Sequence, residues 1–124
     1  MGEGMRERKM KVELTRFQVT DGKSAVVDEW LKFLNDNMED VLVTLEGEKM
    51  YVETIFREKT DGKEYLYWFS VQGDDGLNVE QSDHWVDQKH LEYWEECIDT
   101  SYKPVDLSTE VVMIPKEVKR AMSF

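Results

Sequence analysis

His90 and Glu53 are ionisable side chains that the sequence places on otherwise apolar faces. His90 falls on the apolar stripe of a predicted helix, between Val86 and Cys97. The pKa of a buried imidazole responds to its hydrogen-bond partner, so a cavity at His90 would provide a general acid or base, or a ligand contact. The alternative is a histidine of the core that bonds to the backbone or to a tyrosine.

Glu53 lies in the middle of a predicted strand, on the same face as Ile55 and Arg57. A carboxyl group buried in a cavity is a candidate for catalysis or ligand binding. The alternative is an ion pair with Arg57, either at the surface or across a subunit interface. We take Glu53 and His90 as the candidate catalytic residues.

Several aromatic residues lie in the predicted strands of the sheet. The segment 65–71 reads YLYWFSV and predicts a strand, with Tyr67 on one face and Trp68 on the other. We predict that Tyr67, Trp68, Tyr51 and Arg57 bind a small apolar or aromatic molecule. The alternative is that the rings pack in the core or in an interface.

The sequence predicts neither a metal site nor a cofactor. His84 and His90 lie on different sides of their predicted helix, and Cys97 is the single cysteine. A single cysteine excludes an internal disulfide, which fits a reducing compartment. Cys97 lies on the apolar stripe, so we expect a buried and unreactive thiol.

Length and charge narrow the classes of protein further. The chain has 124 residues, enough for one domain, and its net charge is −11 with a pI near 4.6. Nucleic acids and anionic membranes attract positive surfaces, so we expect neither as a partner. The N-terminus lacks the apolar segment of a signal peptide, and no apolar run is long enough to span a membrane. We expect a soluble cytoplasmic protein.

Hydrophobic periodicity predicts the order β-α-β-β-α-β within a single domain, residues 10–115. The predicted strands are 10–19, 50–59, 65–71 and 107–115, and the predicted helices run from 24 to Gly47 and from 82 or 83 to about 98. Ser24, and either Ser82 or Asp83, are the expected N-caps, and the weak helix formers at 35–37 predict a kink or split. Residues 1–9 are expected to be frayed, and 116–124 to form a tail or short helix.

This order is the ferredoxin-like plan of an α+β fold, in which both helices cover one face of an antiparallel sheet. The strand at 65–71 is apolar on both faces, although a small monomer usually leaves one face of its sheet to water. The helices cover one face, and the other requires a partner. We therefore predict a homodimer.

The plan and the segment DHWVDQKHLEYW at 83–94 resemble the dimeric α+β barrel superfamily, which includes proteins similar to antibiotic-biosynthesis monooxygenases. Many members carry a histidine followed by an aromatic residue in the second helix, as His90 and Trp94 do here. The whole chain looks most similar to an uncharacterised bacterial family within this group. The resemblance implies pairing of two chains sheet against sheet. Members that degrade haem use an Asn on the first strand, which 10–19 lacks, so haem degradation is not expected.

Two functions follow from these features. The first is an uncharacterised, acidic homodimeric domain that binds a small apolar or aromatic ligand. The second is a cofactor-independent enzyme, similar to a monooxygenase or an isomerase, that acts on a small aromatic substrate with His90 as acid or base. A cavity lined by His90 or Glu53 favours the second function, and solid packing around both residues opposes it.

Overall fold

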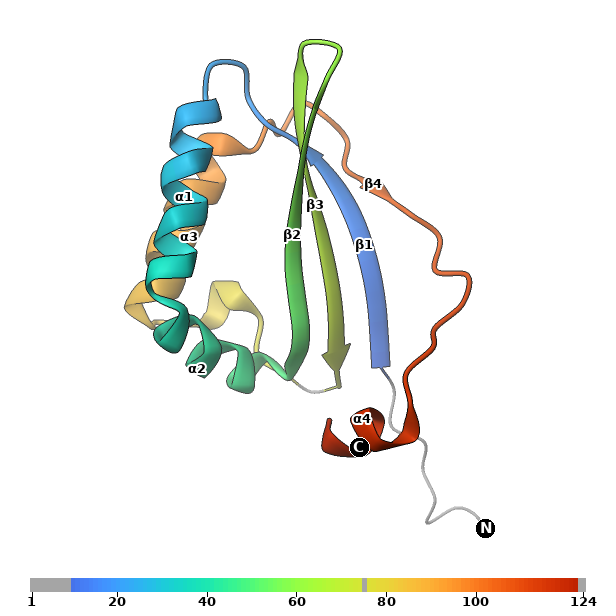
Figure 1. Ribbon diagram of the computed structural model, residues 1–124. Helices are drawn as coiled ribbons and strands as arrows, with labels where there is room; N and C mark the ends of the chain where they lie inside the picture. The colour runs from blue at the N-terminus through green and yellow to red at the C-terminus, as the bar shows by residue number, and fades with distance from the viewer. Residues whose placement is uncertain (1–9, 75, 123–124) are drawn as a thin grey trace.

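An antiparallel sheet organises the chain (Figure 1). The computed structural model describes residues 10–74 and 76–122, so the predicted N-terminal tail lies outside the described residues. Within the described residues the sheet has four strands in the order β2-β3-β1-β4: β1 is Met10–Gln18, β2 is Met50–Thr60, β3 is Lys63–Gly73 and β4 is Val105–Asp106. The α+β class is confirmed, and β1 and β3 occupy the centre of the sheet.

The central strand β3 is apolar on both faces, as its composition predicts. It pairs with β1 in one continuous register and with β2 on its other edge. Leu66 is fully buried under the helices, and Trp68 points the same way and packs against the core. Side chains alternate along a strand, so Tyr67 and Phe69 point away from the helices. β1 pairs with β3 without a bulge, and its residues 14–18 are partly buried on both faces, which accounts for the change of apolar phase.

The turn between β2 and β3 is the tight hairpin that the sequence predicts. Asp61 and Gly62 form it, with φ angles of 51° and 75°. Positive φ at both central residues is the requirement of a type I′ turn, which matches the twist of the flanking strands.

The helices α1, α2 and α3 lie on one face of the sheet (Figure 1). Their bounds are Ser24–Asp36, Met38–Glu48 and Trp85–Cys97; a 3-10 turn, η2, covers Val79–Gln81, and a short helix, α4, covers Lys116–Ala121. The predicted split of the first helical segment is confirmed at Asn37. The side-chain amide of Asn37 donates to the carbonyl oxygen of Phe33 over 2.8 Å, which competes with the helical hydrogen bonds there. None of the helices among the described residues is long and apolar enough to cross a membrane.

The predicted start of α1 is displaced by one residue. Lys23 is the N-cap, and Ser24 is the first helical residue. The hydroxyl and the carbonyl oxygen of Ser24 instead accept hydrogen bonds from the Arg57 guanidinium, both at 3.0 Å. Ser24 therefore bonds to Arg57 of β2 instead of capping its own helix.

The predicted end of α2 and start of α3 also differ from the structure. Gly47 lies inside α2, whose C-cap, Lys49, adopts the left-handed conformation with a φ of 58°. His84, rather than Ser82 or Asp83, is the N-cap of α3, because its Nδ1 accepts the backbone N–H of Val86 at 3.2 Å.

The predicted final strand at 107–115 is wrong. Regular pairing with β1 stops after β4, although Leu107 still donates its N–H to the carbonyl oxygen of Leu14 over 2.9 Å. At Thr109 the side-chain hydroxyl, not a backbone N–H, donates to the carbonyl oxygen of Val12. This bond occupies the Val12 carbonyl oxygen, which a longer β-ladder with β1 would need as an acceptor. Further along the chain, Val111 and Met113 are exposed. The chain then runs beside β1 to α4, at the end of the sheet where β1 begins (Figure 1).

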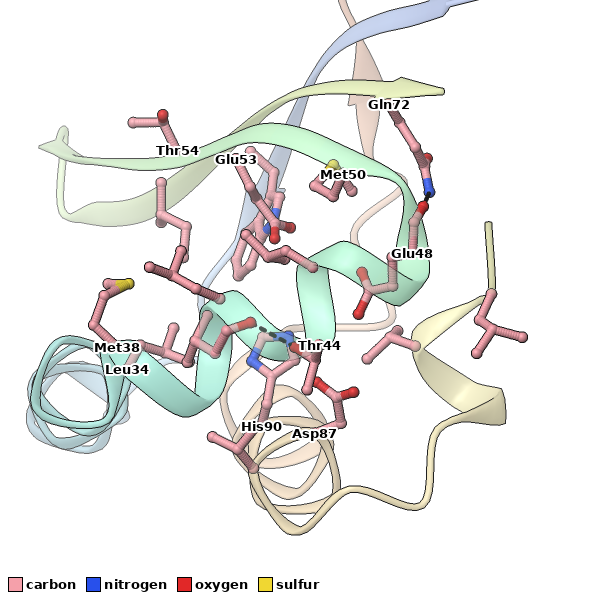
Figure 2. Close-up of a pocket in the computed structure, with 18 of the residues that line it drawn as sticks. Leu34, Met38, Thr44, Glu48, Met50, Glu53, Thr54, Gln72, Asp87 and His90 are labelled. Atoms are coloured by element: carbon pink, nitrogen blue, oxygen red, sulfur yellow. Dashed lines mark hydrogen bonds between the residues drawn. The ribbon is translucent and has the colours of Figure 1, made fainter. Parts of the chain in front are cut away.

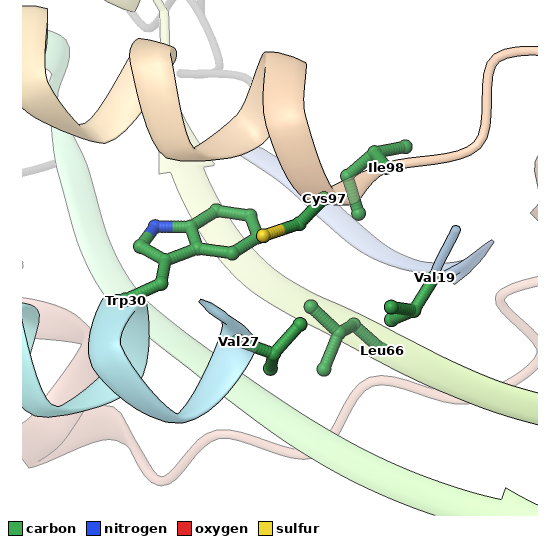
Figure 3. Packing of buried hydrophobic residues seen from close by; sticks show 6 residues of the cluster. All are labelled: Val19, Val27, Trp30, Leu66, Cys97 and Ile98. Atoms are coloured by element: carbon green, nitrogen blue, oxygen red, sulfur yellow. The ribbon is translucent and has the colours of Figure 1, made fainter. Parts of the chain in front are cut away.

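The hydrophobic core occupies one end of the space between the helices and the sheet. Figure 3 shows six of its residues. Trp30 of α1 and Cys97 of α3 meet there above Leu66 of β3, and all three are fully buried. Burial raises the pKa of the Cys97 thiol to about 11, so the expected unreactive thiol is supported. The other end of the same space is not filled by side chains, and it forms the candidate site.

Candidate functional site

A cavity of about 540 Å³ lies between the sheet and the helices, beside α2 (Figure 2). Its walls come from the end of α1, the whole of α2, β2 and β3, and the segment from η2 into α3. The break at Asn37 redirects α2, so that the chain covers this end of the sheet with a second, less deeply packed helix. The only buried residue of α2 is its last one, Glu48.

One part of the cavity is apolar. The side chains of Leu34, Met38, Val41, Leu45 and Met50 line it. None of them is buried, whereas their counterparts in the core, such as Val27 and Trp30, are fully buried. This end of the helical layer therefore has an apolar lining that the described side chains cover only in part.

The other part of the cavity is acidic. Glu48 ends α2, Glu53 projects from β2, and Asp87 lies in the first turn of α3, so three separate elements bring three carboxyl groups into one space (Figure 2). Glu80 of η2 also lines the cavity. No lysine or arginine is among the described residues that line it.

The pKa of Glu48 is strongly raised in the folded protein. Burial raises its pKa to about 7, and the charges of Asp87, Glu53 and Glu80 act in the same direction. Its place at the C-terminus of α2 adds to this effect, because the negative end of a helix dipole disfavours an anion. The carboxyl group of Glu48 is therefore close to half protonated near neutral pH.

The position of Glu48 depends on a close backbone contact with the loop after β3. A Cβ atom on Gly76 would lie 1.9 Å from the carbonyl oxygen of Glu48. The next residue, Leu77, donates its backbone N–H to the carbonyl oxygen of Gly47 over 3.0 Å. Only glycine permits this approach, so Gly76 holds the loop against the acidic end of the cavity.

Glu53 is oriented by a neighbour on β3. The indole N–H of Trp68 donates to Glu53 Oε2 over 2.5 Å. Burial raises the pKa of Glu53; the Trp68 hydrogen bond opposes this shift and the nearby Asp87 charge adds to it.

His90 has a defined hydrogen-bond arrangement, although its partner is neither the backbone nor a tyrosine, as the core alternative expected. The indole N–H of Trp30 donates to His90 Nδ1 over 3.0 Å. An Nδ1 that accepts leaves the imidazole proton on Nε2. Burial lowers the pKa of His90, against the opposing charge of Asp87, so the ring is neutral at physiological pH.

Asp87 was not identified by the sequence analysis. It is 5% exposed, and its Oδ2 atom has no hydrogen-bond partner among the described residues. Its charge acts on Glu48, Glu53 and His90, which places it at the centre of the acidic end. An aspartate in the first turn of a helix is ordinary in a sequence, and its burial depends on how α3 meets α2. No local feature of the sequence therefore distinguishes Asp87 from an ordinary surface aspartate.

The structure brings together three of the residues that the sequence singled out. Glu53, Trp68 and His90 all line the cavity. The expected ion pair between Glu53 and Arg57 is not formed. Arg57 instead contacts Asp28 at 2.6 Å and Glu64 at 2.5 Å.

The remaining predicted ligand contacts lie elsewhere. Tyr67 is on the face of the sheet away from the helices, where its hydroxyl donates to Glu58 Oε1 over 2.6 Å. The ring of Tyr51 lies against Gly73 at the end of β3, 2.9 Å from where a Cβ atom would be. Within the described ranges, 10–74 and 76–122, no group of three His, Cys, Asp or Glu side chains is arranged to hold a metal ion.

The fold and the cavity together define an α+β domain whose helices and sheet enclose a space of ligand size. The chain belongs to a family of unknown function (DUF6176), whose model matches residues 10–120. A search of curated proteins found no match.

Proposed function

We propose that this chain is a small-molecule-binding domain that holds an apolar or aromatic ligand in the cavity beside α2. The observation that carries the proposal is the cavity itself, about 540 Å³ in volume, with an apolar wall and ionisable groups at one end. Ligand sites in proteins typically measure ~300–1,000 Å³ and combine an apolar lining with a few polar groups that orient the ligand.

Two variants of α2 test this proposal. Val41 lines the cavity, whereas Val43, two residues further along the same helix, is exposed. Val41→Trp fills the cavity, and Val43→Trp places the same side chain in water. We expect small cyclic and aromatic compounds to raise the melting temperature of the wild type and of V43W but not of V41W. Equal responses from V41W and V43W would show that these compounds bind elsewhere.

The proposal includes pairing of two chains. The strand order β2-β3-β1-β4, with α1, α2 and α3 on one face, supports the ferredoxin-like plan. The opposite face carries Phe69 at its centre and Phe56, which is 56% exposed, towards the edge strand β2. Contact of this face with the same face of a second copy forms a dimeric α+β barrel and removes both rings from water.

A second candidate function is cofactor-independent catalysis of the isomerase or monooxygenase type. The specific observation that favours it is the pair of Glu53, whose pKa is raised, and neutral His90, whose Nε2–H is a donor. A carboxylate of raised pKa is a better general base near neutral pH. Glu53 would remove a proton next to a carbonyl group, and His90 would donate a hydrogen bond to the resulting oxyanion.

Deuterium exchange tests this second candidate. The probe is 2-tetralone, an aromatic ketone with exchangeable protons, incubated with the protein in D₂O and followed by NMR. Catalysis predicts exchange above the buffer rate that Glu53→Gln abolishes and Glu46→Gln, on the exposed side of α2, retains. An exchange rate equal to that of buffer would remove support for proton transfer, while the binding proposal would stand.

A further inference from the structure

We propose that the ligand of the cavity carries a primary or secondary ammonium group, which donates a hydrogen bond to Asp87 Oδ2, and that its apolar body lies along the inner side of α2. The inference rests on the proposed function, because it names the chemical class of ligand for the same cavity.

The first argument is the state of Asp87. A buried polar atom without a hydrogen-bond partner is rare and costly, and a buried carboxylate oxygen more so. Asp87 is 5% exposed, lines the cavity, and has no partner for Oδ2 among the described residues. Asp87 lies in the first turn of α3, where the helix dipole favours a negative charge. Its Oδ2 atom is therefore a buried acceptor that lacks a donor among the described residues.

The second argument is the balance of charge around that oxygen. Glu48, Glu53 and Glu80 line the same cavity from α2, β2 and η2, and the described lining residues include no lysine or arginine. His90 supplies no positive charge, because burial lowers its pKa. The charges of Asp87, Glu53 and Glu80 raise the pKa of Glu48, and the charge of Asp87 raises that of Glu53. A cation among these groups removes that repulsion.

The third argument selects an ammonium group with N–H bonds. Asp87 Oδ2 needs a hydrogen-bond donor, which a quaternary ammonium lacks. The described residues include no group of three ligating side chains arranged to hold a metal ion. An anion is excluded by the carboxyl groups.

The apolar part of the cavity indicates which chemical group the rest of the ligand carries. Leu34, Met38, Val41 and Leu45 line this part. Figure 2 shows Leu34 and Met38 at a distance from Glu48 and Asp87. A ligand with a charged end and a compact apolar body matches both parts of the space. A polyamine does not, because its second charge would lie against this apolar lining.

Matched probes test the inference. Cyclohexylmethylamine and cyclohexylmethanol have nearly the same shape and differ in charge at neutral pH, so their dissociation constants are compared by titration near pH 7.5. We expect the amine to bind at least about tenfold more tightly, since a charge-assisted hydrogen bond is worth more than a neutral one. Asp87→Asn should remove most of this advantage, because the side-chain amide keeps an acceptor oxygen but carries no charge.

The outcomes separate the inference from the function on which it rests. Equal affinity for amine and alcohol, with both lost in V41W, would overturn the ammonium assignment and leave the cavity as a binding site. Binding of neither probe would overturn both. If D87N fails to fold, the ratio of the wild-type dissociation constants decides, because it requires no variant.

Discussion

The side chains of Glu48 and Asp87 point into one cavity from opposite kinds of helix end (Figure 2). Glu48 is the last residue of α2, where the helix dipole opposes a negative charge, and Asp87 is in the first turn of α3, where the dipole favours it. Both residues are buried. The two carboxyl groups share one space, and the charge of Asp87 contributes to the raised pKa of Glu48.

Replacement of Glu48 by Gln should stabilise the protein in a pH-dependent manner. The pKa of Glu48 is raised in the folded state to about 7, so its favourable contribution is present at acidic pH and is lost as the pH rises through that value. E48Q removes the ionisation. We expect the free energy of unfolding to increase by about 2 kcal/mol at pH 8, relative to the change at pH 5. Urea denaturation at the two pH values measures this difference.

Glu46→Gln is the matched control for this measurement. Glu46 lies on the same helix and is exposed. E46Q should change stability equally at both pH values. An E48Q effect that is also the same at pH 5 and pH 8 would contradict the raised pKa.

Loss of the Trp30 indole N–H should change the titration of His90. The hydrogen bond from Trp30 to His90 Nδ1 is compatible only with the neutral ring, because a protonated ring would place two donors against each other. In Trp30→Phe we expect the pKa of His90 to rise and the free energy of unfolding to fall by about 1–3 kcal/mol. NMR titration of the imidazole protons measures the pKa.

Trp85→Phe provides the comparison, because Trp85 is 51% exposed and lies on the same helix as His90. Its effect on stability should be small. An unchanged His90 pKa in W30F would mean that the indole does not control the protonation of the ring.

Gly76→Ala should destabilise the acidic end of the cavity. The added methyl group would meet the carbonyl oxygen of Glu48 at 1.9 Å, so the loop or the end of α2 must move. We expect a loss of about 1–3 kcal/mol in urea denaturation, together with weaker binding of cavity ligands.

Gly47→Ala is the matched control, because we expect no loss of stability there. Its Cβ atom would make only an ordinary contact of 3.8 Å with Leu77, and Gly47 is helical. Alanine there should be neutral or stabilise by up to about 1 kcal/mol. A G76A protein as stable as G47A would contradict the tight packing of the loop on Glu48.

Much of this arrangement was predictable because local chemistry determines it. The Asp61-Gly62 turn, the split at Asn37 and the inward direction of His90 follow from turn preferences, helix propensity and periodicity. Periodicity put Trp68 and Tyr67 on opposite faces of the strand but did not say which face the helices cover. The residues that were missed depend on tertiary contacts. Glu48 is buried because α2 continues past Gly47, and neither its burial nor that of Asp87 has a local signature.

The predicted strand at 107–115 also failed because of a tertiary contact. Val111 and Val112 have the composition of a strand, but a strand also requires a partner with free hydrogen-bonding groups. Thr109 ends the pairing through its side chain. The sequence around 107–115 does not show this, because the acceptor is on Val12, far away in the chain.

A charge on the helix-free face of the sheet should prevent pairing. Phe56→Glu places a carboxylate on that face, and Val43→Glu places one on α2, where the native residue is similarly exposed at 57%. By sedimentation at micromolar concentration we expect a dimer for the wild type and for V43E. The dimer of F56E should dissociate about tenfold to a hundredfold more readily. Dimers of equal strength for F56E and V43E would place the interface elsewhere.

Methionine-methyl NMR tests the central claim, that the cavity beside α2 is the ligand site, most directly. Met38 and Met50 line the cavity, whereas Met113 is 84% exposed on the segment after β4. Spectra of protein with ¹³C-labelled methionine methyl groups are recorded during titration with cyclohexylmethylamine and assigned with Met→Leu variants. Saturable shifts of Met38 and Met50, with Met113 unchanged, are the predicted result. Shifts confined to Met113, or none at Met38 and Met50 while the amine binds, would contradict the account.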